Sequence, residues 1–231
     1  MENVRDYQSK ELEYFVLSNV IMILLFCKVI SIKELISGNN MIGGVLGMLL
    51  SSAVYGSVLY MAICVIDTII PISWKEKLVF WNEALPGEIV FSEIDADRCK
   101  DRRFLRNEAV KAYADIYSDF PEGEEEKKHY ENAKWYALFK LHEDRRSIKS
   151  ANRDYLMCRD MSCASVVLFG LYLLAVLMIA EIVFDIRAVL VIIGEYILLN
   201  IACRNKATRL VNSVIANDLA VKEKEAKGER K

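Results

Sequence analysis

The chain has 231 residues, of which 54% are hydrophobic and 27% charged, and its 30 basic and 32 acidic residues give a formal net charge of −2. A balance this close to neutral argues against the extended basic surface that nucleic-acid binding requires. The two histidines and six cysteines have neither metal-ligand spacing nor the pattern of a secreted disulfide scaffold, so we expect no metal and no cofactor.

Four long apolar runs frame a charged central block. They cover residues 12–32, 41–66, 161–184 and 188–203. Because about 20 apolar residues allow a helix to cross a bilayer, the sequence predicts an all-α protein with four transmembrane helices. The predicted segments are a first transmembrane hairpin within residues 1–66, a mainly helical domain over 67–160, a second hairpin over 161–203, and a charged C-terminal helix and tail over 204–231.

Basic residues near the ends of these runs predict the orientation. They gather around the central block and after the fourth run, whereas the two short connectors hold only Lys28, Lys33 and Arg187. Since basic residues are retained in the cytoplasm, both termini and the central block are expected on the cytoplasmic side of an inner membrane. The acidic N-terminus, with Glu2 and Asp6, is unlike a signal peptide, so the first run is expected to remain as an anchor.

Small residues recur at a spacing of four along the second run. Gly43, Gly47 and Ser51 share one face, and Ser52 and Gly56 continue on a neighbouring face. Such spacing lets the backbones of two helices approach closely. Two partners fit this face, the first helix of the same chain and a second copy in a homo-oligomer, and the sequence does not choose between them.

A helix is predicted directly after the second run, because Ser73 and Glu76 form a capping-box pattern. Its aromatic and basic residues are typical of a helix that lies in the membrane interface and contacts lipid headgroups. These candidate anchors are Trp74, Lys75, Lys77 and Trp81. A core helix of the soluble domain is the alternative.

The next segment combines an apolar triplet with a row of arginines. Residues 89–91 fit a short strand, and the periodicity from Asp97 to about Ser118 is helical, which would align four guanidinium groups. They belong to Arg98, Arg102, Arg103 and Arg106. Such a row is a candidate clamp for the phosphate or carboxylate of a small anionic ligand. The alternative is a solvated helix face paired with the neighbouring carboxylates of Asp97, Asp101 and Glu108.

Two further helices are predicted before the third run. One covers about 124–146, since its acidic first turn and basic last turn suit the helix dipole. The other begins near Ser147 or Ser150 and continues through Arg159 and Asp160 into the third run. An unbroken helix there would carry a movement of the soluble domain into the membrane.

Glu195 lies in the middle of the fourth and shortest run, where a charge is costly. One interpretation is a polar stripe, with Asn200 and with Glu181 of the third run, that lines a pore or responds to protons. The other is a protonated glutamate that only joins two helices by a hydrogen bond. Its candidate partners in the second run are Ser51, Ser52 and Tyr55.

Spaced positions in residues 80–161 form a pattern. They are Leu85, Pro86, Gly87, Phe91, Asp101, Arg103, Asn132, Trp135, Tyr136, Lys140, His142, Tyr155, Leu156, Arg159 and Asp160. This pattern resembles that of a family of uncharacterised bacterial multi-span inner-membrane proteins, although Asn152 replaces a histidine of the pattern. The resemblance implies no activity. Similar architectures recur in bacterial antiviral systems, which is an analogy of architecture alone.

Two functions fit these expectations. The first is an oligomeric membrane effector or channel-like protein, whose cytosolic domain senses a ligand or partner and rearranges the membrane helices, in an anti-phage role by analogy. The second is a non-conducting scaffold or sensor that recruits a soluble cytosolic protein. An enzyme is not expected, because the central block contains no nucleophile elbow, phosphate-binding glycine loop or metal-ligand cluster.

Overall fold

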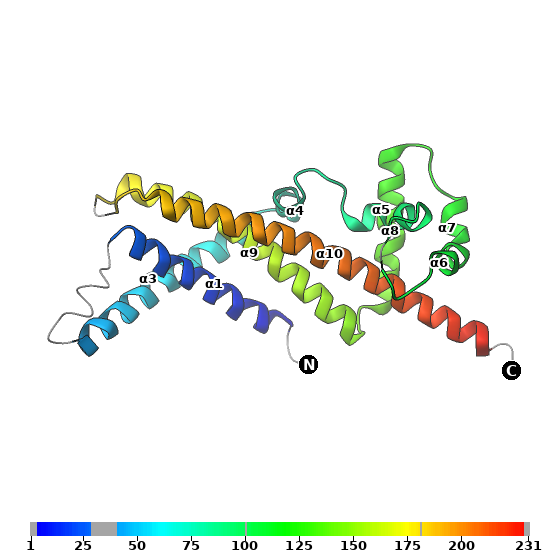
Figure 1. Ribbon diagram of the computed structural model, residues 1–231, viewed down its shortest axis with the longest axis horizontal. Helices are drawn as coiled ribbons and strands as arrows, with labels where there is room; N and C mark the ends of the chain where they lie inside the picture. Colours follow the sequence, from blue (N-terminus) through cyan, green and yellow to red (C-terminus); the bar gives the residue numbers. More distant parts are fainter. Residues whose placement is uncertain (1–3, 29–40, 100, 181, 229–231) are drawn as a thin grey trace. The chain divides into compact units, whose positions relative to one another are not determined.

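The computed structural model describes residues 4–28, 41–99, 101–180 and 182–228, with the side chains of 4–9, 41–46, 48–53 and 55 outside the description. All regular structure in these ranges is helical, which confirms the predicted all-α class there (Figure 1). The helices are α1 (Val4–Phe26), α3 (Met41–Ile69), α4 (Ile72–Phe80), α5 (Pro86–Asp95), α6 (Arg106–Ala112), α7 (Ala114–Ser118), α8 (Glu124–His142), α9 (Arg146–Met178) and α10 (Ile186–Gly228).

The chain divides into two compact units. The membrane unit comprises residues 1–79 and 156–202, and the charged unit comprises 80–155 and 203–231. α9 and α10 are each one unbroken helix that contributes residues to both units. The predicted continuity through Arg159 and Asp160 is therefore confirmed. Its physical basis is the absence of proline after Pro121, since proline interrupts the hydrogen bonds of a helix.

Two described helices, α9 and α10, are long and apolar enough to cross a membrane. A third candidate span combines Gly56–Ile69 of α3 with α4, which is bent by 102° relative to it. Pro71 lies at this bend, where its ring cannot continue the preceding helix. These helices indicate a membrane protein with two to three candidate spans. The fourth predicted span remains a prediction, because the first apolar run extends into residues 29–32, outside the described ranges.

Close packing joins α1 and α3 in the membrane unit. A Cβ atom on Gly56 would lie 2.6 Å from Cδ1 of Leu17. The absence of a side chain at position 56 therefore leaves room for Leu17. Gly47 instead faces open space, with no atom within 4 Å of a Cβ built there. The structure thus gives Gly56 a partner in the first helix of the same chain. Gly43, Ser51 and Ser52 lie outside the described side chains.

The charged unit is built on the contact between α5 and α8. A Cβ atom on Gly87 would lie 2.8 Å from Oδ1 of Asn132 and 3.0 Å from Cε3 of Trp135, so only glycine fits between these helices. The buried carboxylate of Glu131 accepts the backbone N–H groups of Phe91 and Ser92 at 2.9 and 3.0 Å. The adjoining apolar core contains Phe91, Ile94, Ala109, Tyr113, Val211 and Ile215.

The predicted strand over 89–91 is wrong, because these residues lie inside α5. Pro86 occupies the first turn of that helix, and the carboxylate of Glu88 accepts the N–H of Leu85 at 2.8 Å, so local capping starts a helix. The helix predicted after the second run is observed, but it begins at Ile72, directly after Pro71. Ser73 lies inside this helix and therefore does not cap its start.

The predicted single helix from Asp97 to Ser118 is also wrong. α5 ends at Asp95, Asp97 adopts a left-handed conformation with φ 56°, and helix resumes at Arg106 as the short α6 and α7. Asp tolerates this conformation better than most residues, so it ends the helix where the charge spacing suggests continuation. Arg98, Arg102 and Arg103 consequently lie in a loop.

Replacing Gly87 with alanine tests the α5–α8 contact. We expect Gly87→Ala to destabilise the charged unit by about 1–3 kcal/mol, because its methyl group would overpack against Asn132 and Trp135. Thermal unfolding of the full chain in detergent, followed by circular dichroism, measures the effect. Gly170→Ala in α9 is the control, since its Cβ meets open space. Equal stability of the two variants would contradict the close contact.

Candidate functional site

Polar side chains of α10 join it to two other helices of the membrane unit. Asn200 is buried, accepts a hydrogen bond from the hydroxyl group of Ser162 and donates one to the carbonyl oxygen of Leu78 at 3.3 Å. The hydroxyl group of Tyr196 donates to the same carbonyl at 2.7 Å. Leu78 lies in the last turn of α4, whose carbonyl groups lack partners within the helix. α10 supplies partners for the Leu78 carbonyl.

Glu195 contacts a different element. Its carboxyl group is hydrogen-bonded to the side chain of Asn19 in α1. Asn19 is 3% exposed and also donates to the carbonyl oxygen of Phe15 at 3.1 Å. The described partners of Glu195 and Asn200 therefore differ, and no shared polar stripe is observed between them. Glu181 and the side chains of Ser51, Ser52 and Tyr55 lie outside the described residues.

Charged side chains cluster where α3, α4 and α9 meet. Lys75 is 6% exposed and lies 2.5 Å from Oδ1 of Asp67 and 3.7 Å from Oδ1 of Asp160. Arg159 approaches the same Asp160 oxygen at 3.0 Å. The interpretation of Lys75 as a lipid-headgroup anchor is therefore wrong. Its ammonium group is paired with the carboxylates of Asp67, at the end of α3, and Asp160, in α9.

Both tryptophans predicted as interface anchors are exposed. Trp74 is 65% exposed and Trp81 is 55% exposed, and Lys77 is exposed on the same helix. In the charged unit, the guanidinium carbon of Arg204 lies 4.9 Å from the centre of the Trp81 ring, and Arg204 also pairs with Glu83 at 2.7 Å. These contacts hold the indole ring in place while it remains accessible.

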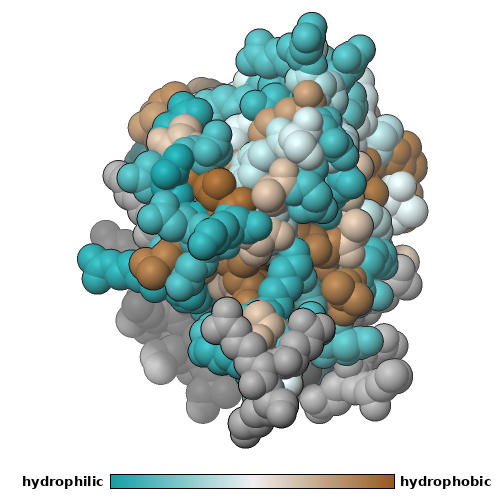
Figure 2. All heavy atoms as spheres, turned by 90° about the vertical axis from the view of Figure 1, so that its right-hand side faces the viewer, coloured by the Kyte–Doolittle hydropathy of each residue, from teal (hydrophilic) through white to brown (hydrophobic). Residues whose placement is uncertain are grey.

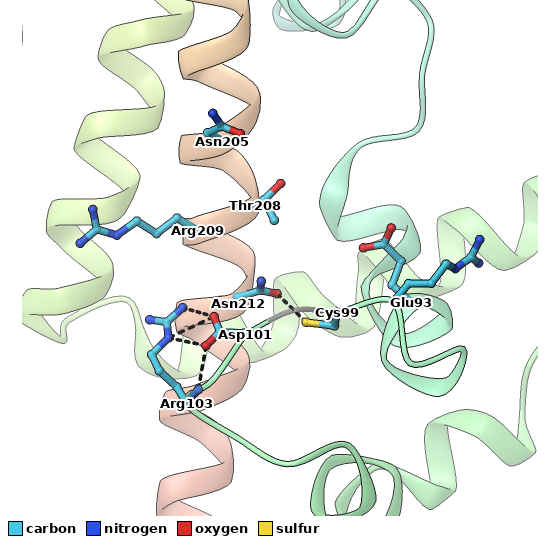
Figure 3. A pocket seen from close by; sticks show the side chains of 9 residues that line it. Glu93, Cys99, Asp101, Arg103, Asn205, Thr208, Arg209 and Asn212 are labelled. Atoms are coloured by element: carbon cyan, nitrogen blue, oxygen red, sulfur yellow. Dashed lines mark hydrogen bonds and ion pairs between the residues drawn. The ribbon is translucent and has the colours of Figure 1, made fainter.

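A polar pocket of about 400 Å³ lies in the charged unit (Figure 3). Its wall combines the end of α5 and the segment that follows it with α10. The lining residues are Glu93, Arg98, Cys99, Asp101, Arg103, Asn205, Thr208, Arg209 and Asn212. The thiol group of Cys99 donates to Oδ1 of Asn212 at 3.7 Å and joins the two sides. The lining offers both charged and neutral hydrogen-bonding groups.

The four predicted clamp arginines do not converge on this pocket. The guanidinium group of Arg103 donates to both carboxylate oxygens of Asp101, at 2.6 to 3.1 Å, and these hydrogen bonds lower the pKa of Asp101. Arg106 instead donates to the carbonyl oxygen of Asp95 at 2.9 Å. Of the four predicted arginines, Arg98 and Arg103 line the pocket, and Arg102 and Arg106 do not.

Sequence reasoning missed Arg209, which also lines the pocket. Figure 3 shows its side chain extending to the opposite side of α10 from Thr208. Its spacing from the other arginines in the sequence gave no signal, because the loop and α10 meet only in the folded unit. Arg98 has no ion-pair partner among the described residues, so its charge is available to an anionic group of a ligand.

A buried polar network joins α10 to α8 and to Tyr113 in the charged unit. Asp218 of α10 contacts Nε2 of His142 at 2.9 Å, accepts the hydroxyl group of Tyr113 at 2.8 Å and pairs with Lys222 at 3.2 Å. Burial alone would raise the pKa of Asp218, but these donors outweigh it and hold the pKa below its ordinary value. Burial and the nearby carboxylate raise the pKa of Tyr113.

Most positions of the sequence pattern have a structural role in this fold. Gly87 packs on Asn132 and Trp135, Asp101 holds Arg103, and His142 contacts Asp218. On the exposed side of α8, Lys140 pairs with Glu143 at 2.8 Å and lies 5.7 Å from the ring centre of Tyr136. Among the described residues no group of three or more His, Cys, Asp or Glu side chains has the arrangement of a metal site.

Comparisons with protein-family models, curated proteins and solved structures found no match. The resemblance to a family of bacterial membrane proteins therefore remains a prediction.

Replacing Asp218 tests the buried network. We expect Asp218→Asn to destabilise the charged unit by about 3 kcal/mol at pH 7, because it leaves buried donors without their carboxylate partner. Tyr113→Phe removes only one hydrogen bond, so about 1–2 kcal/mol is expected. Thermal unfolding in detergent measures both variants.

The same variants give a pH test. A lowered pKa of Asp218 contributes stability above its unfolded-state value, near 4, and this contribution is lost as the pH falls through the folded-state pKa. The difference between wild type and Asp218→Asn should therefore shrink below about pH 4. A constant difference over that range would show that the Asp218 charge does not stabilise the unit.

Proposed function

We propose that the protein is an oligomeric inner-membrane effector or channel-like protein, whose charged unit binds a ligand or partner in the cytoplasm and rearranges the membrane helices. One observation carries the proposal. α10 is a single helix that bears Glu195 and Asn200 in the membrane unit and the pocket residues Asn205, Thr208 and Asn212 in the charged unit. A ligand contacting these pocket residues would act on the helix that is anchored in the membrane unit.

The binding side of the proposal is supported by the polar lining of the pocket. Arg98 supplies positive charge, while Thr208 and Asn212 supply neutral hydrogen-bonding groups, a combination that suits a small anionic molecule. A role in anti-phage defence rests on the analogy of architecture alone.

Ion flux tests the effector function. The full chain is reconstituted in vesicles of phosphatidylethanolamine and phosphatidylglycerol, and release of trapped K⁺ is measured with the protein alone and with inorganic phosphate or ATP as anionic probes. We expect protein-dependent release that at least one probe changes. Release equal to that of protein-free vesicles under every condition would contradict the conducting version.

Breaking α10 tests the coupling. Ile201 is 54% exposed, so Ile201→Pro removes a helix hydrogen bond at a local cost of about 3 kcal/mol without opening a packed core. We expect this variant to lose the probe-dependent change in K⁺ release, while Ile201→Ala keeps it. Limited proteolysis checks that the charged unit remains folded in both. An unchanged response of Ile201→Pro would exclude transmission along α10.

The oligomeric part has its own test at Gly47. This residue meets open space within one chain, so a larger side chain fits the monomer but would disturb a second copy packed there. We expect Gly47→Ile to reduce the mass of the detergent-solubilised protein, measured by light scattering. Gly170→Ile, at another open position, should leave the mass unchanged. Equal masses for both variants would contradict a seam at Gly47.

A non-conducting scaffold that recruits a soluble partner is the second candidate. It is favoured by large apolar side chains exposed on α8, where Tyr136 is 51% and Leu141 71% exposed. The face seen in Figure 2 is largely hydrophilic, with separate hydrophobic patches, as expected for a surface that contacts water. A scaffold predicts no protein-dependent K⁺ release, so the flux measurement separates the two functions.

A further inference from the structure

The contact between Glu195 and Asn19 contains more acceptors than donors. Asn19 uses its amide N–H groups toward the Phe15 carbonyl oxygen and toward Glu195. Oδ1 of Asn19 and Oε2 of Glu195 are both buried, and neither has a hydrogen-bond partner among the described residues. An unpaired buried acceptor is unfavourable, because it has lost the hydrogen bonds that water would make with it.

The surroundings provide no positive charge that would hold a carboxylate. α1 has no charged residue after Glu13, α9 has none after Asp160, and residues 41–66 contain none. On α10 the nearest basic residue on either side of Glu195 is Arg187, paired with Asp185, or Arg204, paired with Glu83. The only interaction that the described residues make with the carboxyl group is the hydrogen bond from Asn19.

Four other titratable groups of this unit have partners of their own. Tyr196 donates to the Leu78 carbonyl oxygen, Tyr172 contacts Asp185, and Tyr60 is hydrogen-bonded to Cys64. Asp67 is paired with Lys75. None of these groups supplies the missing donor.

From this arrangement we infer that Glu195 binds a proton and is held as a neutral carboxylic acid, whose O–H donates to Oδ1 of Asn19 while the Asn19 amide donates to its carbonyl oxygen. One proton thus converts two unpaired acceptors into a donor–acceptor pair. It also removes a charge from the apolar run, where a charge is unfavourable. The pair is a proton-dependent link between α1 and α10, and it stands independently of the proposed function.

The carbonyl band of a protonated carboxyl group in the infrared spectrum tests this inference directly. The full chain is measured in vesicles of phosphatidylethanolamine and phosphatidylglycerol at pH 7. We expect a band above the amide I region that Glu195→Gln abolishes and Tyr196→Phe retains. Absence of any band that Glu195→Gln removes would overturn the proposal, including the case in which a metal cation occupies the two oxygens.

Stability as a function of pH gives a second measurement. Glutamine mimics the neutral acid, because its amide group can donate to Oδ1 of Asn19 and accept from the Asn19 amide, so Glu195→Gln should fold and keep wild-type stability at pH 7. Raising the pH removes the proton from the wild-type protein alone, so its thermal midpoint should fall relative to Glu195→Gln as the infrared band disappears. Parallel pH profiles would overturn the proposal.

Asn19→Leu separates the partner from the apolar environment. This variant removes the acceptor and the donor while keeping an apolar volume in α1. We expect the carbonyl band to remain and to move to higher frequency, because the acid loses both hydrogen bonds. An unmoved band would show that Asn19 is not the partner of the protonated group.

Discussion

A buried polar group must find a hydrogen-bond partner inside the protein, and this constraint determines what packs against α10 at each level. Asn200 meets Ser162 and the α4 carbonyl, the Cys203 thiol meets the Tyr155 carbonyl, and Lys206 pairs with Asp154 at 2.8 Å. Further along, Ser213 accepts from Arg103 and Asp218 meets Tyr113 and His142. Apolar packing stabilises both units, but it permits sliding, whereas these directional bonds fix the register of the helix.

The helix content followed largely from local rules. Apolar runs, an acidic first turn and the absence of proline predicted α8 and the unbroken α9, and these signals need only neighbouring residues. The arginine row was wrongly predicted to be helical, because that prediction also used only neighbouring residues. Its spacing is helical, but the conformation of Asp97 and the pairing of Arg103 with Asp101 determine where the guanidinium groups lie.

The side chains that pair with one another in the candidate sites could not be predicted from the sequence. Lys75 looked like a lipid anchor because its neighbours are tryptophans, yet Asp67 and Asp160 neutralise it in the folded unit. Asn19 was overlooked as an isolated polar residue in an apolar run, and its significance depends on Glu195, which lies on the last helix of the chain. Such pairings depend on tertiary contacts, which spacing along one segment does not encode.

Between Gly194 and Gly228, α10 contains neither glycine nor proline. Sharp kinks in helices arise at such residues or where a bulge or water enters the backbone ladder, so this stretch has no built-in hinge. If the pocket binds a ligand as proposed, a displacement of these side chains would move the stretch as a stiff element rather than bend it. A shift along the axis would have to exchange the directional bonds that fix the register, and its natural step is one helical turn of about 5.4 Å.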